Sequence, residues 1–468
     1  MFKTADEVHS SLKPRFRGEL LRPSDHSYEQ ASAIWNGMVA KTPGLIARCA
    51  DVADVQSALR AAARTGVLTA VRCGGHSLAG HSTCDGGLVI DLSRMRRVTV
   101  EPERRRARFD GGCLLGNVDA ATLPHGLAFP SGVVSHTGAS GLVLGGGFGW
   151  LTRFGGLSCD NAEEFTMVTV GGSIVRANSR ENADLFWALR GGGGNFGVVI
   201  EFRVKLHPVT SVMLGEGFCL GDEIPRLLRR WREYMPEAPE RLKWNISLRV
   251  APNADNVPAE LRGRAGLSET VLWVGNPEEG KKYLEQAFAL AKHVGVINRV
   301  MSFLELQTMA DHEFPHGRRY YTKSGYFQSL DDGSIERMVE SLATIPSPMS
   351  QIELAYLGGA AQKVAADETA FGDRSAPFVI NLLGHWSHSS GDAANVEWVR
   401  KLFQTLRPAM TPGVYVNFMS GDEEGRVREA YHERWERLVA VKSKYDPENF
   451  LRLNQNIPPR KTGGESLV

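Results

Sequence analysis

The chain has little cysteine and no excess of charge of either sign. Six cysteines among 468 residues are too few for a disulfide framework, so we expect small buried side chains. Lysine and arginine number 54 against 53 acidic residues, a formal net charge of +1. This balance argues against a nucleic-acid partner or an anionic membrane surface, because both select basic proteins.

Long apolar runs are also missing. No stretch approaches the roughly 18 apolar residues of a membrane-spanning helix. The first residues, MFKTADEVHSSLKPRFRGELL, lack the apolar segment of a secretory signal. We therefore expect a cytoplasmic protein without a membrane partner. The sequence indicates no oligomeric state.

Glycine is abundant, and half of its 50 residues lie between positions 74 and 197. Three glycine loops stand out: RCGGHS (72–77), HTGASGLVLGGGFG (136–149) and RGGGGNFG (190–197). Bare backbone N–H groups can bind phosphates, although glycines can also serve tight turns alone. Three such loops, each beside predicted strands, favour a large phosphate-bearing cofactor.

The loop at 190–197 also contains a G-x-G-x-x-G pattern. The dinucleotide fingerprint requires a strand before the glycines and a helix after them. Here a predicted helix at 181–189 comes first, and an alternating strand at 198–206 follows. The order is reversed, so a Rossmann nicotinamide site is rejected.

The periodicity of the chain changes after about Pro208. Before it, a helix over 51–66 with Asp51 as N-cap and Gly66 as stop precedes a buried strand at 67–72. A hairpin over 165–177 is expected to turn at a primed two-residue Gly-Gly pair. After it come longer alternating strands and helices, including helices over 278–295, 392–406 and 423–442. The pattern predicts a second, α+β domain with an antiparallel sheet.

Five segments in order resemble FAD-linked oxidases of the berberine-bridge type, in the vanillyl-alcohol-oxidase (PCMH) superfamily. They are RCGGHS, SHTGASGLVLGGGFGWLTRFGGLSCDN (135–161), DLFWALRGGGGNFGVV (184–199), YVNF (415–418) and KYDPENFLRLNQNIPP (444–459). Several segments are most similar to a bacterial member that oxidises and rearranges a poly-β-carbonyl compound. The resemblance implies an α+β fold with a two-subdomain PCMH-type FAD-binding domain and an α+β substrate domain. The expected divisions are 1–208 (core about 41–208), 209–410 and a berberine-bridge-like segment at 411–468 that returns to the FAD domain.

The resemblance also implies how FAD is held. His76 would bond covalently to the flavin, and Cys159 would supply a second link, with an inert buried thiol as the alternative. No metal is expected, because His385 and His388 in HWSH would point to opposite faces of a strand. The other expected FAD contacts are Arg72, Gly74, Gly75, Ser77, His81, Gly138, Gly141, Gly146, Gly147, Asp160, Gly197, Val199, Tyr415, Asn417 and Asn454.

Glu353 is the candidate base. In SQIELAYLGG, Gln351, Glu353 and Ala355 share one strand face, and a partly buried carboxylate there would have a raised pKa. Many family members use a tyrosine where this chain has Phe418, and some use a base where it has Asn381. By the same resemblance, His136 and Thr137 would lie near the flavin ring. The expected substrate-facing residues are Trp150, Ser247, Asn381 and Phe418.

The resulting hypothesis is an oxidase of a small organic or polyketide-like molecule. It would remove a proton from an alcohol or enolisable carbon while flavin N5 accepts a hydride, and O2 would take the electrons. The alternatives are oxygenation through a flavin-N5-oxide, or a flavin-binding protein without catalytic activity.

Overall fold

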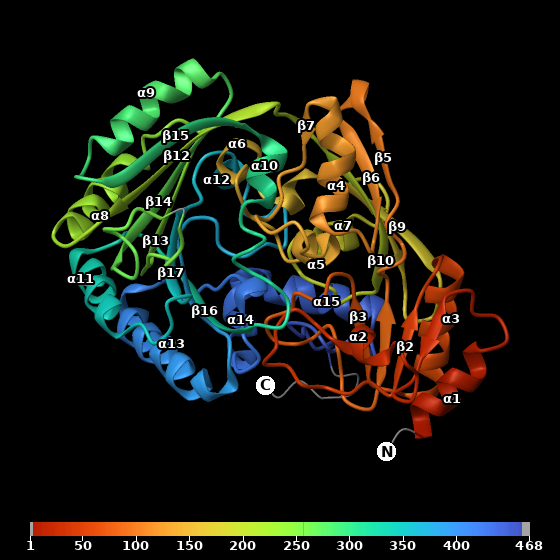
Figure 1. The fold of residues 1–468 in the computed structure, drawn as a ribbon. Coiled ribbons are helices and arrows are strands. Elements are labelled where there is room, and N and C mark those ends of the chain that lie inside the picture. Colours follow the sequence, from red (N-terminus) through yellow and green to blue (C-terminus); the bar gives the residue numbers. More distant parts are fainter. Residues whose placement is uncertain (1–2, 256, 461–468) are drawn as a thin grey trace, which may run out of the picture.

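The computed structural model describes residues 3–255 and 257–460, and its chain forms two halves that face each other (Figure 1). A four-stranded sheet of order β1-β2-β4-β3 opens the first half, with β2, β4 and β3 parallel and β1 antiparallel to β2. Its strands are β1 (Glu19–Leu21), β2 (Leu45–Arg48), β3 (Thr69–Arg72) and β4 (Leu88–Asp91). Nearby lie the helices α1 (Lys3–Leu12), α2 (Tyr28–Ser32) and α3 (Val52–Thr65).

Helix α3 has the N-cap and the glycine stop that the sequence predicts. The Asp51 side chain accepts a hydrogen bond from the Asp54 N–H, which caps the first turn. Gly66 ends the helix in the left-handed conformation at φ 66°. Val55, Ala58, Leu59 and Ala62 are buried on one side. The chain then enters β3 and reaches the glycine loop that carries His76.

The first half contains a second, five-stranded antiparallel sheet of order β5-β6-β10-β8-β9. Its strands are β5 (Val98–Glu101), β6 (Arg106–Asp110), β8 (Ala162–Val168), β9 (Ile174–Asn178) and β10 (Val198–Lys205); β7 (Leu127–Ala128) pairs separately with β11 (His207–Pro208). The helices here are α4 (Leu115–Thr122), α5 (Ala139–Leu144), α6 (Thr152–Gly155) and α7 (Ala183–Leu189).

The connection between β8 and β9 is not the primed two-residue turn that the sequence predicts. The Gly172 N–H bonds to the Thr169 carbonyl, and only Gly172 of the glycine pair has a positive φ, 81°. A longer loop with a left-handed glycine at its end therefore replaces the two-residue turn.

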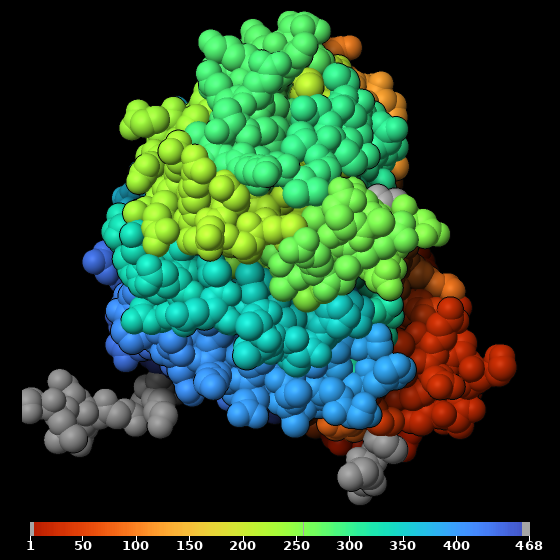
Figure 2. Space-filling model, turned by 60° about the vertical axis from the view of Figure 1, so that its left-hand side comes forward, coloured from red at the N-terminus to blue at the C-terminus, as the bar shows by residue number. Residues whose placement is uncertain are grey.

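A seven-stranded antiparallel sheet of order β15-β12-β14-β13-β17-β18-β16 forms the second half. Helices lie over its outer face, the side that comes forward in Figure 2, and its other face turns toward the first half. The strands are β12 (Ser211–Cys219), β13 (Leu242–Val250), β14 (Ala265–Val274), β15 (Val294–Ser302), β16 (Arg319–Phe327), β17 (Gln351–Tyr356) and β18 (Phe378–Trp386). The helices are α8 (Glu223–Tyr234), α9 (Pro277–Phe288), α10 (Phe303–Thr308), α11 (Asp332–Ser341), α12 (Ala360–Lys363) and α13 (Asp392–Leu406).

Two helix predictions were too long. Helix α9 ends at Phe288, and the residues after it form the edge strand β15 instead of continuing the helix to 295. The helix expected over 423–442 is divided into α14 (Val427–Tyr431) and α15 (Trp435–Tyr445). His432 interrupts it with a φ of 44°, a left-handed conformation that a continuous helix cannot contain.

The C-terminal segment returns to the first half. Val414, Tyr431 and Leu438 are buried in the same apolar cluster as Phe109 and Phe165 of the five-stranded sheet. Lys442 Nζ, also buried, donates to the Asn195 carbonyl at 2.8 Å. Within residues 3–255 and 257–460, the longest apolar helices fall short of what a membrane crossing needs.

Candidate active site

A cavity of about 1360 Å³ receives wall residues from both halves and from the C-terminal segment. Its volume exceeds the roughly 300–1,000 Å³ of a site for one drug-sized ligand, so it has room for a cofactor and a substrate together. Eighteen of the residues predicted from the sequence line it: Gly74, Gly75, His76, Ser77, His81, Thr137, Gly138, Gly141, Trp150, Gly197, Val199, Ser247, Glu353, Asn381, Tyr415, Asn417, Phe418 and Asn454.

Glycines leave part of the cavity wall without side chains. A Cβ placed on Gly141 or Gly194 would meet no atom within 4 Å, so each would project into open space. Gly74 allows two loops to approach closely. A Cβ added at Gly74 would lie 2.4 Å from the Gly138 nitrogen and would hold the two loops apart. Asn454 Oδ1, on the same wall, is buried without a partner in the described chain. Bare backbone beside an unpartnered polar atom fits a large polar cofactor such as a dinucleotide.

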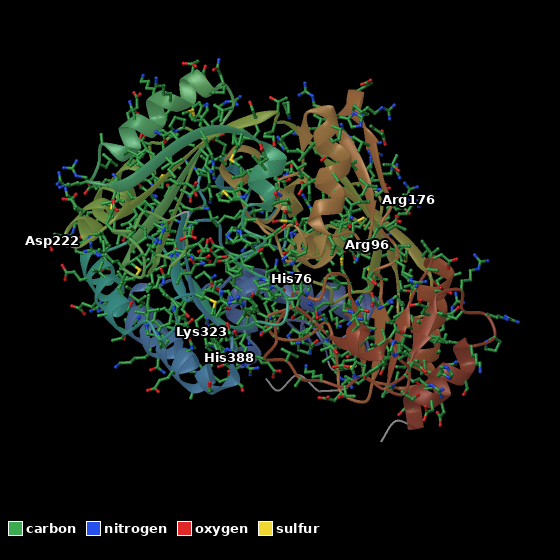
Figure 3. All side chains as sticks on the ribbon, viewed as in Figure 1. His76, Arg96, Arg176, Asp222, Lys323 and His388 are labelled. Carbon is green, nitrogen blue, oxygen red and sulfur yellow. The ribbon has the colours of Figure 1, made fainter. Side chains whose placement is uncertain are left out.

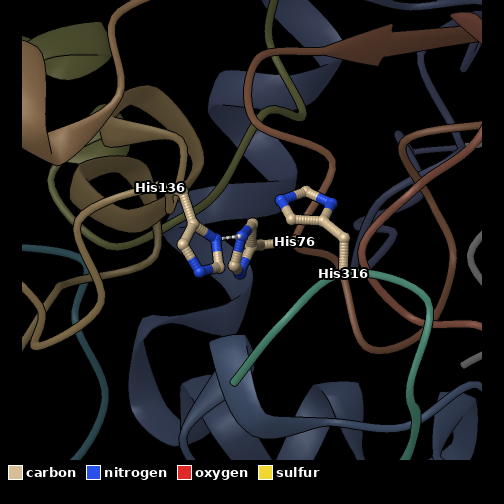
Figure 4. A group of neighbouring side chains, drawn as sticks. All are labelled: His76, His136 and His316. Carbon is tan, nitrogen blue, oxygen red and sulfur yellow. Dashed lines mark hydrogen bonds between the residues drawn. The ribbon is translucent and has the colours of Figure 1, made fainter. Parts of the chain in front are cut away.

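His76 stands at the centre of the molecule, between the two halves (Figure 3). Its Nε2 lies 2.8 Å from Nδ1 of His136, and its Nδ1 lies 3.4 Å from Thr137 Oγ1 (Figure 4). Burial lowers the pKa of His76 well below its ordinary value, and the neighbouring His136 and His316 lower it further. The ring is therefore neutral at physiological pH, which is the form in which an imidazole nitrogen can act as a nucleophile.

Sequence reasoning missed the aromatic support of His76. Trp35 stacks on the His76 ring with centroids 4.8 Å apart and also on Tyr320 at 3.7 Å. Trp35 Nε1 donates to the Phe314 carbonyl at 2.8 Å, which ties this stack to the second half. Nothing in the local sequence around Trp35 indicates this role, because Tyr320 lies far along the chain.

His316 is the second missed residue at this position. The ring nitrogens of His76, His136 and His316 all lie within 4.8 Å of one another. His316 is exposed, whereas the other two are partly buried. The Ser135 N–H donates to Asp311 Oδ1 at 2.7 Å, which fixes the loop carrying His136 to the second half.

Tyr415 and Asn417 hold the longest glycine loop from the C-terminal side. The Tyr415 hydroxyl accepts hydrogen bonds from the Gly147 N–H at 3.0 Å and from Asn417 Nδ2 at 2.8 Å. Asn417 Nδ2 also donates to the Leu142 carbonyl at 3.2 Å. Both residues line the cavity as well, so they join the wall to the loop behind it.

Six predicted site residues are not part of the cavity wall: Arg72, His136, Gly146, Gly147, Cys159 and Asp160. Arg72 is buried and paired with Asp91 at 2.6 Å, so it stabilises the end of β3. Gly146 and Gly147 are needed for their positive φ values, 120° and 81°. His136 instead contacts His76, with its Nδ1 2.8 Å from His76 Nε2.

Asp160 has a structural pairing instead of a position at the cofactor. Its Oδ1 and Oδ2 accept two hydrogen bonds from the Arg374 guanidinium, at 2.5 and 3.0 Å, and both side chains are only 6% exposed. Oδ2 also accepts from the Leu157 N–H at 2.9 Å. The pair joins the 158–161 turn to the second half.

Cys159 lies beneath the cavity and not on it. Its side chain is fully buried in an apolar cluster that includes Tyr326, Leu357 and Phe371. Burial raises the pKa of the thiol well above its ordinary value, and the adjacent Asp160 raises it further. A buried, protonated thiol is a poor nucleophile. The second flavin link through Cys159 stays a prediction, which the burial of its thiol disfavours.

Glu353 lies on the cavity wall, on the inner face of the seven-stranded sheet. Gln351 Nε2 donates to its Oε1 at 2.9 Å, and Asn381 Nδ2 donates to its Oε2 at 2.7 Å. Ser247 Oγ in turn donates to Gln351 Oε1 at 2.8 Å, which orients that amide. Burial raises the pKa of Glu353, although the Asn381 hydrogen bond and the Arg249 charge oppose the shift. A carboxylate held in this way is a candidate general base.

Phe418 faces the same cavity without an ionisable group. Its ring packs against Phe148 and Tyr415, with centroid distances of 5.4 and 4.9 Å. Among the acids of the described cavity wall, Glu216 is paired with Arg299 and Glu313 with Arg249. Glu353 is the one held by neutral amides, which leaves its charge available for proton transfer.

Comparisons with known proteins agree with this geometry. An FAD binding domain family matches residues 43–178, and a berberine and berberine-like family matches residues 414–458. The uncharacterized FAD-linked oxidoreductase YgaK of Bacillus subtilis (strain 168) is 31% identical over 454 residues, covering 96% of this chain and 98% of YgaK.

Two solved structures share the architecture. The 6-hydroxy-D-nicotine oxidase from Arthrobacter nicotinovorans superimposes with a TM-score of 0.85 at 29% identity, covering 95% of this chain and 98% of that one. Glucooligosaccharide oxidase from Acremonium strictum, which carries a 6-S-cysteinyl, 8α-N1-histidyl FAD, has a TM-score of 0.86 at 23% identity, covering 97% and 100%.

The matched domains, the fold and the cavity together define an FAD-linked oxidoreductase. The chain belongs to the berberine-bridge-like family of the PCMH (vanillyl-alcohol-oxidase) superfamily.

Proposed function

We propose that this protein is an oxidase that holds FAD covalently through His76 and oxidises a small organic molecule with Glu353 as the base. The single observation that carries the proposal is that Glu353 and His76, from opposite halves of the chain, line the same cavity. The substrate would be an alcohol or a compound with an enolisable carbon, and O2 would accept the electrons.

His76 would bond the cofactor through Nδ1, because His136 engages Nε2 at 2.8 Å. Its neutral ring, stacked on Trp35, is fixed in orientation before the bond forms. The bare glycines Gly141 and Gly194 would let the polar part of the cofactor approach the backbone. When bound, FAD supplies hydride acceptance and electron transfer to O2, chemistry that amino-acid side chains lack.

Glu353 would take the proton from the substrate. Its two oxygens are fixed by Gln351 and Asn381, so the carboxylate is oriented in advance. Because burial raises its pKa, Glu353 binds a proton more strongly than an exposed glutamate would, as a general base requires. Phe418 contributes an apolar surface that excludes water from this part of the wall.

Anaerobic reduction of the bound flavin tests the proposal. A panel of alcohols and β-dicarbonyl compounds is mixed with the protein, and bleaching of the yellow colour is followed. We expect Glu353→Gln to keep the flavin spectrum and to slow bleaching by about 100-fold or more, the usual size of a general-base contribution.

The matched control is Glu216→Gln, a change of the same type on the same cavity wall. Glu216 is paired with Arg299, so this variant should bleach within about twofold of the unaltered protein. Equal rates for Glu353→Gln and the unaltered protein would remove Glu353 from the reaction. A flavin that no member of the panel bleaches would contradict the proposed activity.

A further inference from the structure

Lys243 is a buried amine that the proposed reaction does not use. It lies on β13, is 2% exposed, and lines the cavity. Its neighbours Leu242 and Trp244 face the outer core of the sheet, so Lys243 belongs to the inner face with Asn245 and Ser247. In the described part of the chain, Lys243 Nζ has no hydrogen-bond partner.

The positive charge of Lys243 has no counterion near it. Glu216 and Glu313 are paired with arginines, Glu353 is held by Gln351 and Asn381, and these are the acids of the described cavity wall. Glu240, the acid nearest to Lys243 along the chain, is paired with Lys363. An unpaired buried ammonium is costly and gives up its proton readily, so a bound anion is what would hold Lys243 in its charged form.

Arg153 adds a second positive charge near Lys243. Arg153 donates through Nε to the Leu242 carbonyl at 2.8 Å and through Nη2 to the Ala238 carbonyl at 2.7 Å. Its guanidinium is buried next to neutral carbonyls, its Nη1 has no partner among the described residues, and the charge of Glu240 partly offsets its own. Burial together with the Arg153 charge lowers the pKa of Lys243 to about 7.

Trp150 supplies a neutral hydrogen-bond donor, its indole N–H, in the part of the sheet that carries Lys243. Lys243 is the cross-strand partner of Leu272 on β14, and Leu272 is the partner of Leu214 on β12. Trp150 packs in one cluster with Leu272 and Leu214, so it lies over this part of the sheet. Trp150 lines the cavity, and its Nε1 is buried without a partner in the described chain.

We propose that Lys243, with Trp150 beside it, binds a carboxylate group of the substrate. One ammonium and one neutral N–H suit a singly charged carboxylate, whereas a phosphate dianion would require more cations. The inference rests on the proposed function of this cavity and specifies its substrate class. The substrate would be an elongated carboxylic acid that carries its oxidised carbon away from the acid group.

The strand register sets the separation of the two ends. Ser247 is the cross-strand partner of Glu353. Lys243 lies four residues earlier on β13, about 13 Å away at the strand rise of ~3.3 Å per residue. A molecule anchored at Lys243 would therefore present an atom several bonds from its carboxylate to Glu353.

Binding of sodium octanoate to the flavin-loaded protein tests this inference without any turnover. Octanamide, uncharged and of similar length, is the comparison ligand, and calorimetry measures both. We expect octanoate to bind the unaltered protein, and Lys243→Met to weaken octanoate binding at least tenfold while octanamide binding changes less than twofold.

Arg249→Gln is the control variant, because Arg249 lies on the same strand and the same cavity wall. It should leave octanoate binding within about twofold. Retained yellow colour after acid precipitation shows that each variant has folded and kept its flavin. Loss of octanoate binding in Arg249→Gln but not in Lys243→Met would overturn the inference, as would failure of the unaltered protein to bind octanoate.

Proton uptake gives a second readout that a structural role of Lys243 would not produce. A bound carboxylate raises the pKa of a neighbouring amine, so octanoate binding near pH 7.5 should take up a fraction of a proton. Calorimetry in buffers of different ionisation enthalpy measures it, and Lys243→Met should abolish it. Equal uptake in both proteins would contradict the assignment. These results do not depend on flavin reduction, so they separate the inference from the proposed oxidase activity.

Discussion

His76 and His136 are joined ring to ring, with Nε2 of His76 2.8 Å from Nδ1 of His136. The two imidazoles come from different glycine loops, and burial lowers the pKa of both. One ring nitrogen of His76 is thus occupied by a neutral partner, and the other is directed toward the Thr137 hydroxyl. This arrangement leaves Nδ1 of His76 as the nitrogen through which we propose the bond to FAD.

The first prediction concerns how many links hold the flavin. Since the Cys159 thiol is buried away from the cavity, His76→Ala alone should release all flavin on acid precipitation. Cys159→Ser should keep a yellow pellet and an intact mass increased by one FAD. A His76→Ala pellet that stays yellow, and loses its colour only after Cys159 is also replaced, would establish the second link.

The second prediction concerns the rate of attachment. His136→Ala removes the hydrogen-bond partner of His76 Nε2, so the ring loses its fixed orientation. We expect covalent incorporation to slow by about tenfold or more when FAD is added to flavin-free protein, consistent with the loss of one buried hydrogen bond. His316→Ala, at an exposed position, should react at nearly the unaltered rate. Equal rates in all three proteins would remove His136 from this role.

The third prediction is a pH dependence. Burial raises the pKa of Glu353 above its ordinary value of 4.5, and only the deprotonated carboxylate can accept a proton. The rate of flavin reduction should therefore fall with decreasing pH, and its midpoint should lie above that of an exposed glutamate. Stopped-flow measurement of flavin reduction across the pH range follows this fall in rate. Glu353→Gln should show no such fall, and a fall that persists in the variant would belong to another titrating group.

The fourth prediction concerns stability. Asp160 and Arg374 are 6% exposed and join the two halves, so Asp160→Ala leaves a buried guanidinium without its partner. The free energy of unfolding should fall by about 3–5 kcal/mol. The control is the exposed ion pair between Arg17 and Asp51. Arg17→Ala is used because Asp51→Ala would also remove the cap of α3, and it should lower the free energy of unfolding by less than about 1 kcal/mol. Urea unfolding measures both, and similar losses would show that the buried pair is not specially stabilising.

Local features could be predicted well from the sequence. Asp51 and Gly66 begin and end α3 as expected, because capping depends only on neighbouring residues. The face shared by Gln351 and Glu353 also follows from the two-residue strand period, and their side chains are indeed hydrogen-bonded. The glycine loops by themselves indicate a phosphate-bearing cofactor. The prediction that His76 and Cys159 bond to it rests on the family resemblance alone.

Features that depend on distant contacts could not be predicted. Strand β15 is an exposed edge without apolar alternation, so the preceding helix pattern extended into it. Trp35 stacks on His76 and also on Tyr320, which is nearly 300 residues away in the chain. The direction of the Cys159 thiol depends on how its turn packs against Phe371 and Tyr326. Lys243 could have been noticed, since strand alternation places it on the same face as Ser247.

The C-terminal return of the chain has a consequence for biosynthesis. Asn454 and Tyr415 complete the wall that Gly74 and His76 begin, and Lys442 ties the last helix to Asn195. A nascent polypeptide therefore has no finished cofactor site until the segment that carries Tyr415 and Asn454 has left the ribosome and docked. If FAD is held covalently as we propose, a coloured molecule is one in which the segment from Tyr415 to Asn454 has folded onto the first half, so the pigment itself reports that this docking took place.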